Sequence, residues 1–370
     1  MWYLIGIILS VFLFFLLVLK RNKSTPDRIL ACWIAVIAIH QLLHYVEQSG
    51  AFFYYPHLLG LSFPLPLLHG ILLFFYVSAL TSEQSIRLKT ALPHFIPFAL
   101  LIVLAIPFYS LSGPEKVRVF AQEGEGFEWY SVIQLSLIVV SGLGYVAGSL
   151  VLIGKHRRRI QQQYSNTDKK NLNWLVYLST GLGLIWLLAA FFDDAVIFSG
   201  VVALVLFIGF FGISQLPIFY SPPALSQAAE KDAPAVPAPE EVSPDAQVTR
   251  YAKSGLKEEE AARVYRRLKE LMEQEALYKK SDLTLAELAA QIDIHPNYLS
   301  QVINEREQKN FYHYINGLRV EAFIRAATGP ERRQYTLLAL AYDCGFNSKS
   351  TFNKYFKQHT GKTPSAYFGE

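Results

Sequence analysis

One short stretch of the chain carries amide and hydroxyl side chains at helical spacing. They are Asn297, Ser300, Gln301 and Asn304. Apolar side chains fall between them at Leu299, Val302 and Ile303, so a helix here would have one polar and one apolar face. An amide can form two hydrogen bonds with the edge of an adenine, and a hydroxyl can bond several bases. The spacing therefore predicts a helix whose polar face projects outward and suits the edges of bases.

A second stretch repeats this design with lysines added. Its polar residues are Lys349, Ser350, Asn353, Lys354 and Lys357. Phe352 and Phe356 lie one turn apart and are predicted to form the buried face of the same helix. Lysine favours the acceptor atoms of guanine. This second helix is thus also predicted to present hydrogen-bonding side chains to solvent.

Local signals indicate what positions the first of these helices. Thr284 and Glu287 have the spacing of a capping box, which opens a helix by satisfying its first free amides. The pattern breaks at residues 293–295, and Pro296 fits the first turn of a new helix, where its missing N–H costs nothing. A helix, a three-residue turn and a second helix with polar outward side chains form the geometry of major-groove readers.

The second unit is built in the same way. Asn310 is predicted to cap a longer intervening helix, and Thr336 to cap the helix after it. Gly345 suits a left-handed helix end, and Ser348 is then placed to cap the helix that carries the lysines. The sequence from residue 281 onward therefore predicts two helix-turn-helix units joined by a long helix.

These residues carry a resemblance to a known family. The runs concerned are LTLAELAAQIDIHPNYLSQVINE, NFYHYINGLRVEAF and TLLALAYDCGFNSKSTFNKYFKQHTGKTPSAYF. Together they resemble the DNA-binding domain of the AraC/XylS family of bacterial transcription regulators, over about 281–368, or roughly a quarter of the chain. The spacing GF-x-S-x-S-x-F-x-x-x-F-K-x-x-x-G-x-x-P is its most specific part, because it combines turn, core and cap positions.

The resemblance implies which residues read DNA. It implies that the two units enter two successive major grooves on one face of the duplex. By position, base-reading roles fall on Asn297, Ser300, Gln301, Lys349, Ser350, Asn353 and Lys354. Gln308 departs from the family, which usually has glycine there, and a left-handed turn at this residue would cost on the order of 1 kcal/mol.

A further set of polar residues is predicted to contact DNA phosphates. These are Asn304, Arg306, Lys309, Arg332, Lys357 and Lys362. Phosphate contacts position a protein on DNA without reading its sequence. The alternative interpretation of each of these residues is a surface side chain that contacts only solvent. Because the net charge of residues 248–370 is only +4, we expect weak nonspecific binding that depends partly on dimerisation or clustering.

The N-terminal part of the chain is apolar enough to enter a membrane. Only 17% of the whole chain is charged, whereas soluble domains average about a quarter. Stretches long enough, or nearly so, to cross a hydrocarbon core of about 30 Å lie near 2–19, 29–46, 58–80, 91–111, 130–154, 172–192 and 195–214. The first is expected to be retained, because its basic residues follow the apolar run, unlike those of a removable signal peptide.

Basic residues set the predicted orientation of these seven spans. The loops after the first, third and fifth spans hold twelve Lys and Arg, whereas the alternate loops hold two, Lys116 and Arg118. Basic loops stay on the cytoplasmic side. We therefore expect the N-terminus outside and the C-terminal DNA-binding domain inside, at a bacterial cytoplasmic membrane.

The expected protein is all-α and has four parts. Residues 1–220 would form a seven-span transmembrane sensor domain, and 221–247, with six prolines and seven alanines, a flexible linker. Residues 248–280 would hold a leading amphipathic helix that packs on its own domain, and 281–370 the double helix-turn-helix domain. The two cysteines, Cys32 and Cys344, exclude a disulfide framework and a thiolate-rich metal site.

Ionisable residues in or beside the apolar segments mark a candidate sensor site. They are His40, His44, Glu47, His69, Asp193 and Asp194. Such groups are costly in a membrane and are usually functional. They would line an outward-facing pocket for a small polar ligand or for an ion such as zinc, which imidazole and carboxylate ligands suit. The alternative is a set of polar residues that bond one another across the bundle, and the identity of any metal stays open.

No catalytic motif accompanies these features. The sequence has no phosphate-binding loop, HExxH motif, nucleophile elbow or kinase signature, so we expect neither an enzyme nor a cofactor. It favours a membrane-bound one-component transcription regulator. The expected partners are promoter DNA, RNA polymerase, the lipid bilayer, an unknown small ligand or ion, and a second copy of the chain. Two alternatives stay open: a transporter-like protein with a DNA-binding reporter tail, and a membrane anchor that releases the regulator by proteolysis.

Overall fold

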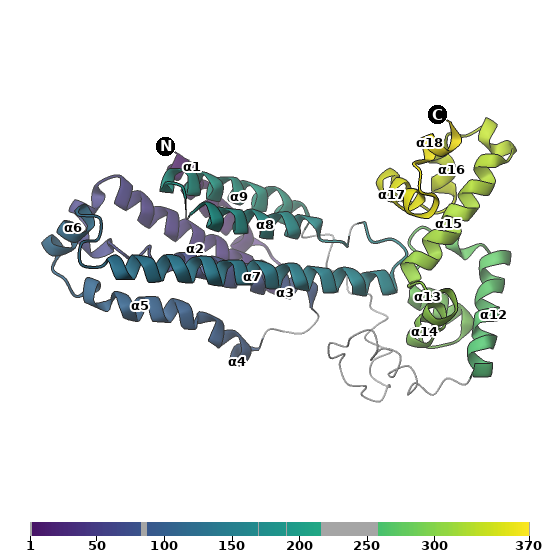
Figure 1. Cartoon of the computed structure of the whole chain (residues 1–370), viewed down its shortest axis with the longest axis horizontal. Coiled ribbons are helices and arrows are strands. Elements are labelled where there is room, and N and C mark those ends of the chain that lie inside the picture. The colour runs from purple at the N-terminus through teal and green to yellow at the C-terminus, as the bar shows by residue number, and fades with distance from the viewer. Residues whose placement is uncertain (1, 83–86, 169, 190, 216–257, 370) are drawn as a thin grey trace. The chain divides into compact units, whose positions relative to one another are not determined.

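The computed structural model describes residues 2–82, 87–168, 170–189, 191–215 and 258–369 (Figure 1). Within these ranges the chain is helical, and its one β-type pairing is an isolated bridge between Tyr164 and Thr284. The chain divides into two compact units. Unit 1 comprises residues 1–156 and 172–220, and unit 2 comprises 157–171 and 221–370. The prediction of an all-helical protein is confirmed for the described residues.

Unit 1 is a bundle of mainly apolar helices. Its α-helices are α1 (Trp2–Leu19), α2 (Thr25–Gln48), α3 (Leu65–Thr81), α4 (Leu88–Ala91), α5 (Ile96–Tyr109), α6 (Gly113–Ala121), α7 (Glu128–Gln163), α8 (Asn173–Leu188) and α9 (Asp194–Gln215). Three short 3₁₀ segments accompany them, at Ala51–Phe53, Pro56–Leu58 and Leu92–Phe95. The last residues of α7, from 157 onward, belong to unit 2.

The prediction of seven membrane spans is not confirmed. Among the described residues, four helical segments are long and apolar enough to cross a membrane, namely Thr25–Gln48, Leu88–Tyr109, Glu128–Gln163 and Asp194–Phe211. Apolar helices also occupy the other three predicted positions, but the segments Leu4–Leu19, Leu65–Thr81 and Asn173–Leu188 are shorter. At 1.5 Å per residue, a helix of 17 residues such as α3 rises only about 25 Å.

Helix α3 begins later than the sequence predicts. The expected span 58–80 starts with turns, and the α-helix begins only at Leu65. Pro64 stands at its N-cap, and a second proline, Pro66, follows in the first turn. Proline has no N–H to donate, so it is tolerated at a helix start but not inside a helix. The two prolines therefore set the start of α3.

Large side chains from several helices fill the core of unit 1. Trp33 on α2, Tyr76 on α3 and Leu175 on α8 are fully buried. Glycine permits close approach at one point, because a Cβ on Gly142 of α7 would lie 2.6 Å from the ring of Trp186. The bundle is thus tightly packed inside while many apolar side chains on its outer faces are exposed.

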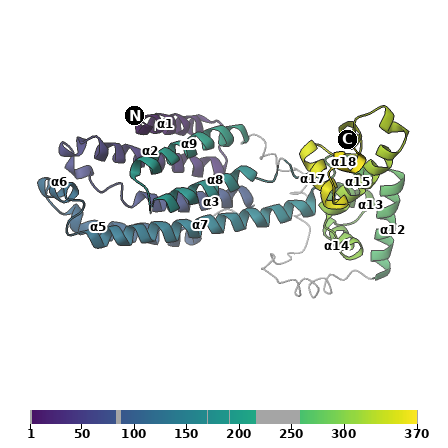
Figure 2. The ribbon, with the colours of Figure 1, turned by 45° about the horizontal axis from the view of Figure 1, so that its top comes forward.

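Unit 2 contains a helical domain around one core. Its helices are α12 (Glu258–Gln274), α13 (Leu285–Ile292), α14 (Pro296–Glu307), α15 (Phe311–Thr328), α16 (Leu337–Asp343), α17 (Lys349–Thr360) and α18 (Pro364–Phe368). Helix α15 runs between the α13–α14 pair and the α16–α17 pair (Figures 1 and 2). Short 3₁₀ segments lie at Leu277–Lys279 and Pro330–Arg333.

The leading helix of this domain packs as its apolar pattern predicts. Ala261, Val264, Leu268 and Leu271 of α12 are buried in the same core as the helices that follow. The predicted linker 221–247 lies outside the described residues. One boundary differs from the prediction, because residues 157–171 group with unit 2 and not with the rest of the predicted transmembrane domain 1–220.

Candidate nucleic-acid interface

The first helix-turn-helix unit has the local geometry that its sequence predicts. The Thr284 hydroxyl accepts a hydrogen bond from the Glu287 amide at 3.1 Å, and the Glu287 carboxylate accepts one from the Thr284 amide at 3.0 Å. Helix α13 then ends at Asp293, which is left-handed with φ 58°. After this turn Pro296 opens α14, and the His295 ring accepts a hydrogen bond from the amide of Asn297. Capping and turn residues thus fix where α14 begins.

The second helix-turn-helix unit repeats this arrangement. Thr336 caps α16 and Ser348 caps α17, each through a hydroxyl that accepts a backbone amide three residues later. The turn between them contains Gly345 at φ 97°. A Cβ on Gly345 would lie 2.7 Å from the carbonyl oxygen of Lys279, so both the backbone angle and the space require glycine there.

Most of the predicted base-reading residues are accessible. On α17, Lys349, Ser350 and Lys354 are exposed and Asn353 is half-buried. On α14, Asn297 is exposed and Ser300 is half-buried. These six side chains therefore stay available for hydrogen bonds with a ligand outside the domain.

The prediction that Gln301 projects outward is wrong. Its side chain is 8% exposed, and its Nε2 donates a hydrogen bond to Glu305 at 2.9 Å. Helix α14 packs against α12, α13 and α15, so its buried face is wider than the stripe of Leu299, Val302 and Ile303. Packing on several sides, which the helical period does not reveal, removes Gln301 from the accessible face.

The predicted phosphate contacts occupy the surface of the same domain. Arg306, Lys309, Lys357 and Lys362 are exposed, and Asn304 and Arg332 are half-buried. Two of them already have partners. Arg306 forms an ion pair with Glu258 of α12, and Arg332 donates to the carbonyl oxygen of Tyr335 at 3.2 Å.

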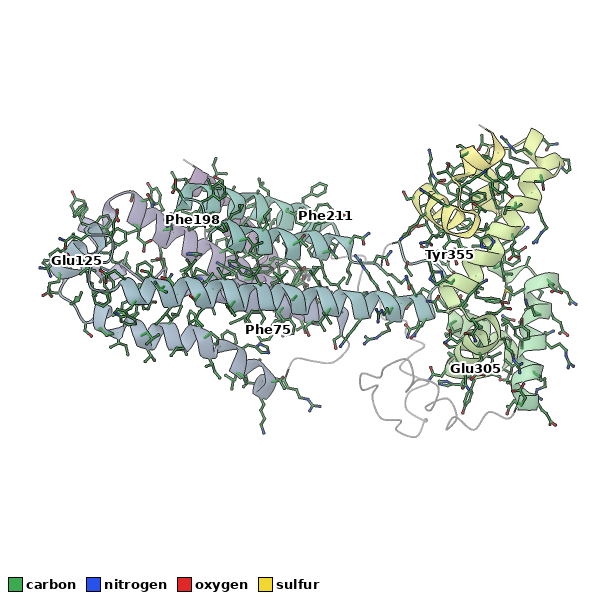
Figure 3. All side chains as sticks on the ribbon, viewed as in Figure 1. Phe75, Glu125, Phe198, Phe211, Glu305 and Tyr355 are labelled. Atoms are coloured by element: carbon green, nitrogen blue, oxygen red, sulfur yellow. The ribbon has the colours of Figure 1, made fainter. Side chains whose placement is uncertain are left out.

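The imidazole of His313 on α15 lies near two lysines, Lys309 after α14 and Lys354 on α17. His313 Nδ1 lies 3.0 Å from the hydroxyl of Tyr355, and that hydroxyl donates to the His313 carbonyl at 2.8 Å (Figure 3 labels Tyr355). Burial, and then the positive charges of Lys309 and Lys354, lower the pKa of His313. His313 is therefore a neutral side chain at neutral pH. It lies where basic residues from the first and second helix-turn-helix units come near each other.

Arg319 is a buried polar residue of this domain that sequence reasoning missed. It is 1% exposed, and its guanidinium donates to the carbonyl oxygens of Tyr278 at 2.7 Å and Lys280 at 2.8 Å. Burial lowers its pKa to about 10, so it still carries a charge at neutral pH. Its position three residues after the buried Asn316, on an otherwise apolar face of α15, is the signal that could have revealed it.

In unit 1, five of the six predicted sensor residues lie in linked pairs. His40 Nδ1 of α2 lies 3.1 Å from His69 Nε2 of α3. His44 lies 3.6 Å from Glu47 on the same helix and 3.9 Å from Asp194 at the start of α9. Asp193 is exposed and accepts the amide of Val196 through its backbone carbonyl.

A further hydrogen bond and an aromatic ring lie beside these sensor residues. The Ser62 hydroxyl donates to Glu47 at 2.6 Å, and the ring of Phe198 stacks on His44 with centroids 3.9 Å apart (Figure 3 labels Phe198). Among the residues that the structure describes, no group of three or more His, Cys, Asp or Glu is arranged to hold a metal ion. The geometry thus resembles the predicted alternative, polar residues that bond one another across the bundle.

Comparisons with known proteins identify the domain that contains the two helix-turn-helix units. Residues 288–370 match a family model described as a helix-turn-helix domain. The chain carries an AraC-type helix-turn-helix domain. The AraC-type domain covers less than a quarter of the chain, so the match does not extend to unit 1.

A curated relative matches about a quarter of the chain. It is an uncharacterized HTH-type transcriptional regulator of Staphylococcus aureus (strain COL), 30% identical over 94 residues. The aligned segment covers 25% of this chain and 12% of the relative, so the chain spans about an eighth of the relative's length. No solved structure matches the chain.

Proposed function

We propose that this protein is a transcription regulator that binds double-stranded DNA through both helix-turn-helix units of its AraC-type domain. The observation that carries this proposal is the pair of capped helices, α14 and α17, with accessible amide, hydroxyl and lysine side chains. Such side chains at the start of a second helix are what major-groove recognition requires. The match to a helix-turn-helix family and the name of the staphylococcal relative support the same function.

The N-terminal helices hold the regulator in a bacterial cytoplasmic membrane. Four helical segments have the length and apolarity of membrane spans, and shorter apolar helices stand at the three other predicted positions. Large apolar side chains on their outer faces, such as Ile8, Val140 and Phe210, are more than two-thirds exposed. Apolar surface of this extent is costly in water and favourable in lipid, which supports a membrane location.

The AraC-type domain lies on the cytoplasmic side. The distribution of basic residues supports this orientation, because the loop between α7 and α8 is one of the three loops that are rich in Lys and Arg. Hydrogen bonds join residues of that loop to the AraC-type domain, which requires both to be on one side of the membrane. DNA and RNA polymerase are available to the domain in that compartment.

The helical bundle senses a signal and passes it to the domain. The cluster of His40, His44, Glu47, His69 and Asp194 supports this part of the proposal, because its polar side chains join α2 to α3 and α2 to α9. A small polar ligand or a proton that altered these bonds would change how the three helices pack. A second copy of the chain could then bring two AraC-type domains to neighbouring DNA sites.

Genome-wide DNA crosslinking of the full-length protein in fractionated membranes tests this function. We expect discrete peaks at promoters, weakened in Lys354→Ala and unchanged in Arg263→Ala, which removes an equal charge from an exposed position on α12. Peaks carried only by a soluble fragment would support release by proteolysis instead. An absence of peaks under all conditions would contradict DNA binding.

A further inference from the structure

A short segment between α7 and α8 lies against the AraC-type domain within unit 2. It comprises residues 164–168. Tyr164 pairs with Thr284 in an isolated antiparallel bridge, and the amide of Ser165 donates to the carbonyl oxygen of Leu283 at 3.1 Å. Leu283 and Thr284 directly precede α13. The segment therefore contacts the first helix-turn-helix unit through its backbone.

The same segment is anchored on the long helix α15. Asn316 Nδ2 donates to the carbonyl oxygen of Ser165 at 2.9 Å, and Arg319 Nη2 lies 3.1 Å from the Ser165 hydroxyl. Ser165 is 1% exposed. The polar groups buried on α15 thus find part of their hydrogen bonding in this segment, and a contact that satisfies buried donors is specific.

The segment also reaches the second helix-turn-helix unit, at the start of α17. The carboxylate of Asp168 accepts a hydrogen bond from the Ser348 hydroxyl at 2.7 Å and another from the hydroxyl of Thr351. Ser348 is the N-cap of α17, and the accessible Lys349 and Ser350 follow it. A negative charge is therefore held at the positive end of the helix that we propose reads DNA.

We propose that residues 164–168 form an intramolecular clamp on the AraC-type domain and that the Asp168 carboxylate occupies a binding place for a DNA phosphate. This inference rests on the proposed function. Serine and threonine hydroxyls at the start of a helix are common phosphate ligands on DNA. Ser348 and Thr351 cannot serve Asp168 and a phosphate at once, and the two anions repel each other. The docked segment and bound DNA therefore compete.

The clamp gives the membrane helices a direct route to the DNA-binding domain. The segment follows α7, which ends at Gln163, and precedes α8, which begins at Asn173. A displacement of either helix is carried into residues 164–168 over a few residues of chain. A signal that moves residues 164–168 away from α17 makes this helix accessible to DNA. A signal that favours their contact with α17 lowers the affinity for DNA.

Removing the Asp168 carboxylate tests the clamp in the full-length protein. The protein is reconstituted in lipid nanodiscs and titrated with a labelled duplex of mixed sequence, about 40 base pairs long to cover two major grooves and their flanks. We expect Asp168→Ala to bind this DNA about tenfold more tightly than the wild type, since a hydrogen-bonded charged competitor is gone. The control is Asp343→Ala, which removes one exposed carboxylate from α16 of the same domain and should change affinity far less.

Hydrogen exchange distinguishes competition from a merely structural contact. Binding of the duplex to the wild type should speed exchange at the amide of Ser165, which donates to Leu283 in the docked state. Unchanged or weaker DNA binding by Asp168→Ala, or a Ser165 amide that stays protected on DNA, would overturn the clamp. If neither the wild type nor any variant binds DNA, the proposed function itself fails.

Discussion

At the scale of single residues, Asn353 and Lys357 on α17 separate two kinds of DNA contact. Asn353→Ala should cost about 1–3 kcal/mol in discrimination between a promoter fragment and scrambled DNA, because an amide reads a base edge. Lys357→Ala should weaken binding to both DNAs alike and reduce the slope of log affinity against log salt by about 1. Fluorescence anisotropy over a series of salt concentrations measures both effects. A sequence-dependent loss in Lys357→Ala would contradict its assignment to the backbone.

Arg319 is the residue whose loss should cost the AraC-type domain most stability. Its guanidinium holds the buried carbonyl oxygens of Tyr278 and Lys280, which no apolar side chain can satisfy. We expect Arg319→Met to lower the free energy of unfolding by about 3–5 kcal/mol. Thermal unfolding of the purified protein measures this loss. Arg325→Met, at an exposed position on the same helix, should change stability by less than about 0.5 kcal/mol.

At the scale of elements, the end of α14 is strained at Gln308. Its φ is 53°, a left-handed angle that costs a residue with a Cβ about 1 kcal/mol. Gln308→Gly should therefore stabilise the domain by roughly 0.5–1 kcal/mol. The matched change Gln291→Gly lies within α13 and should destabilise the domain by about 1 kcal/mol. Equal effects of the two changes on the unfolding temperature would contradict this reading.

The contact between α12 and α14 should make the domain sensitive to acid. Although burial opposes ionisation, hydrogen bonds from Tyr265 and Lys269 lower the pKa of Glu307 below its ordinary value. The native state thus binds the proton less tightly than the unfolded state does. The stabilisation from this carboxylate is complete above about pH 4.5 and is lost as the pH falls through the lower native pKa.

Glu307→Gln should isolate this effect. The variant should be about 1 kcal/mol less stable than the wild type at neutral pH. Its unfolding temperature should also fall less steeply between about pH 5 and 3. Glu275→Gln, at an exposed position after α12, serves as the control and should follow the wild type. If the unfolding temperature of Glu307→Gln falls with pH as steeply as that of the wild type, other carboxylates are responsible for the acid sensitivity.

At the scale of the whole molecule, the proposed orientation predicts opposite compartments for two loops. Alkaline phosphatase fused after Gly124, between α6 and α7, should be active because it would lie outside the cytoplasm. The same enzyme fused after Tyr220 should be inactive, and a fluorescent protein fused there should be bright. Active phosphatase at both sites would mean that an even number of spans separates them, and hence that α8, the shorter apolar helix between the two sites, does not span.

The sequence determined the elements whose signals are local. The caps at Thr284, Thr336 and Ser348, the turn at Gly345 and the start of α14 at Pro296 all follow from residues within one turn of each boundary. The apolar spacing on α12 likewise determined which of its faces is buried. These features depend on backbone hydrogen bonds and helical period, which short stretches of sequence specify.

Only the tertiary structure decided the contacts between distant parts of the chain. The burial of Gln301 depends on three other helices that pack on α14, and the charge of Arg319 is accommodated by carbonyl groups some forty residues earlier. Asp168 meets Ser348 across 180 residues. Helical period gives the direction of a side chain but not what packs against it, because that depends on how separate helices are brought together.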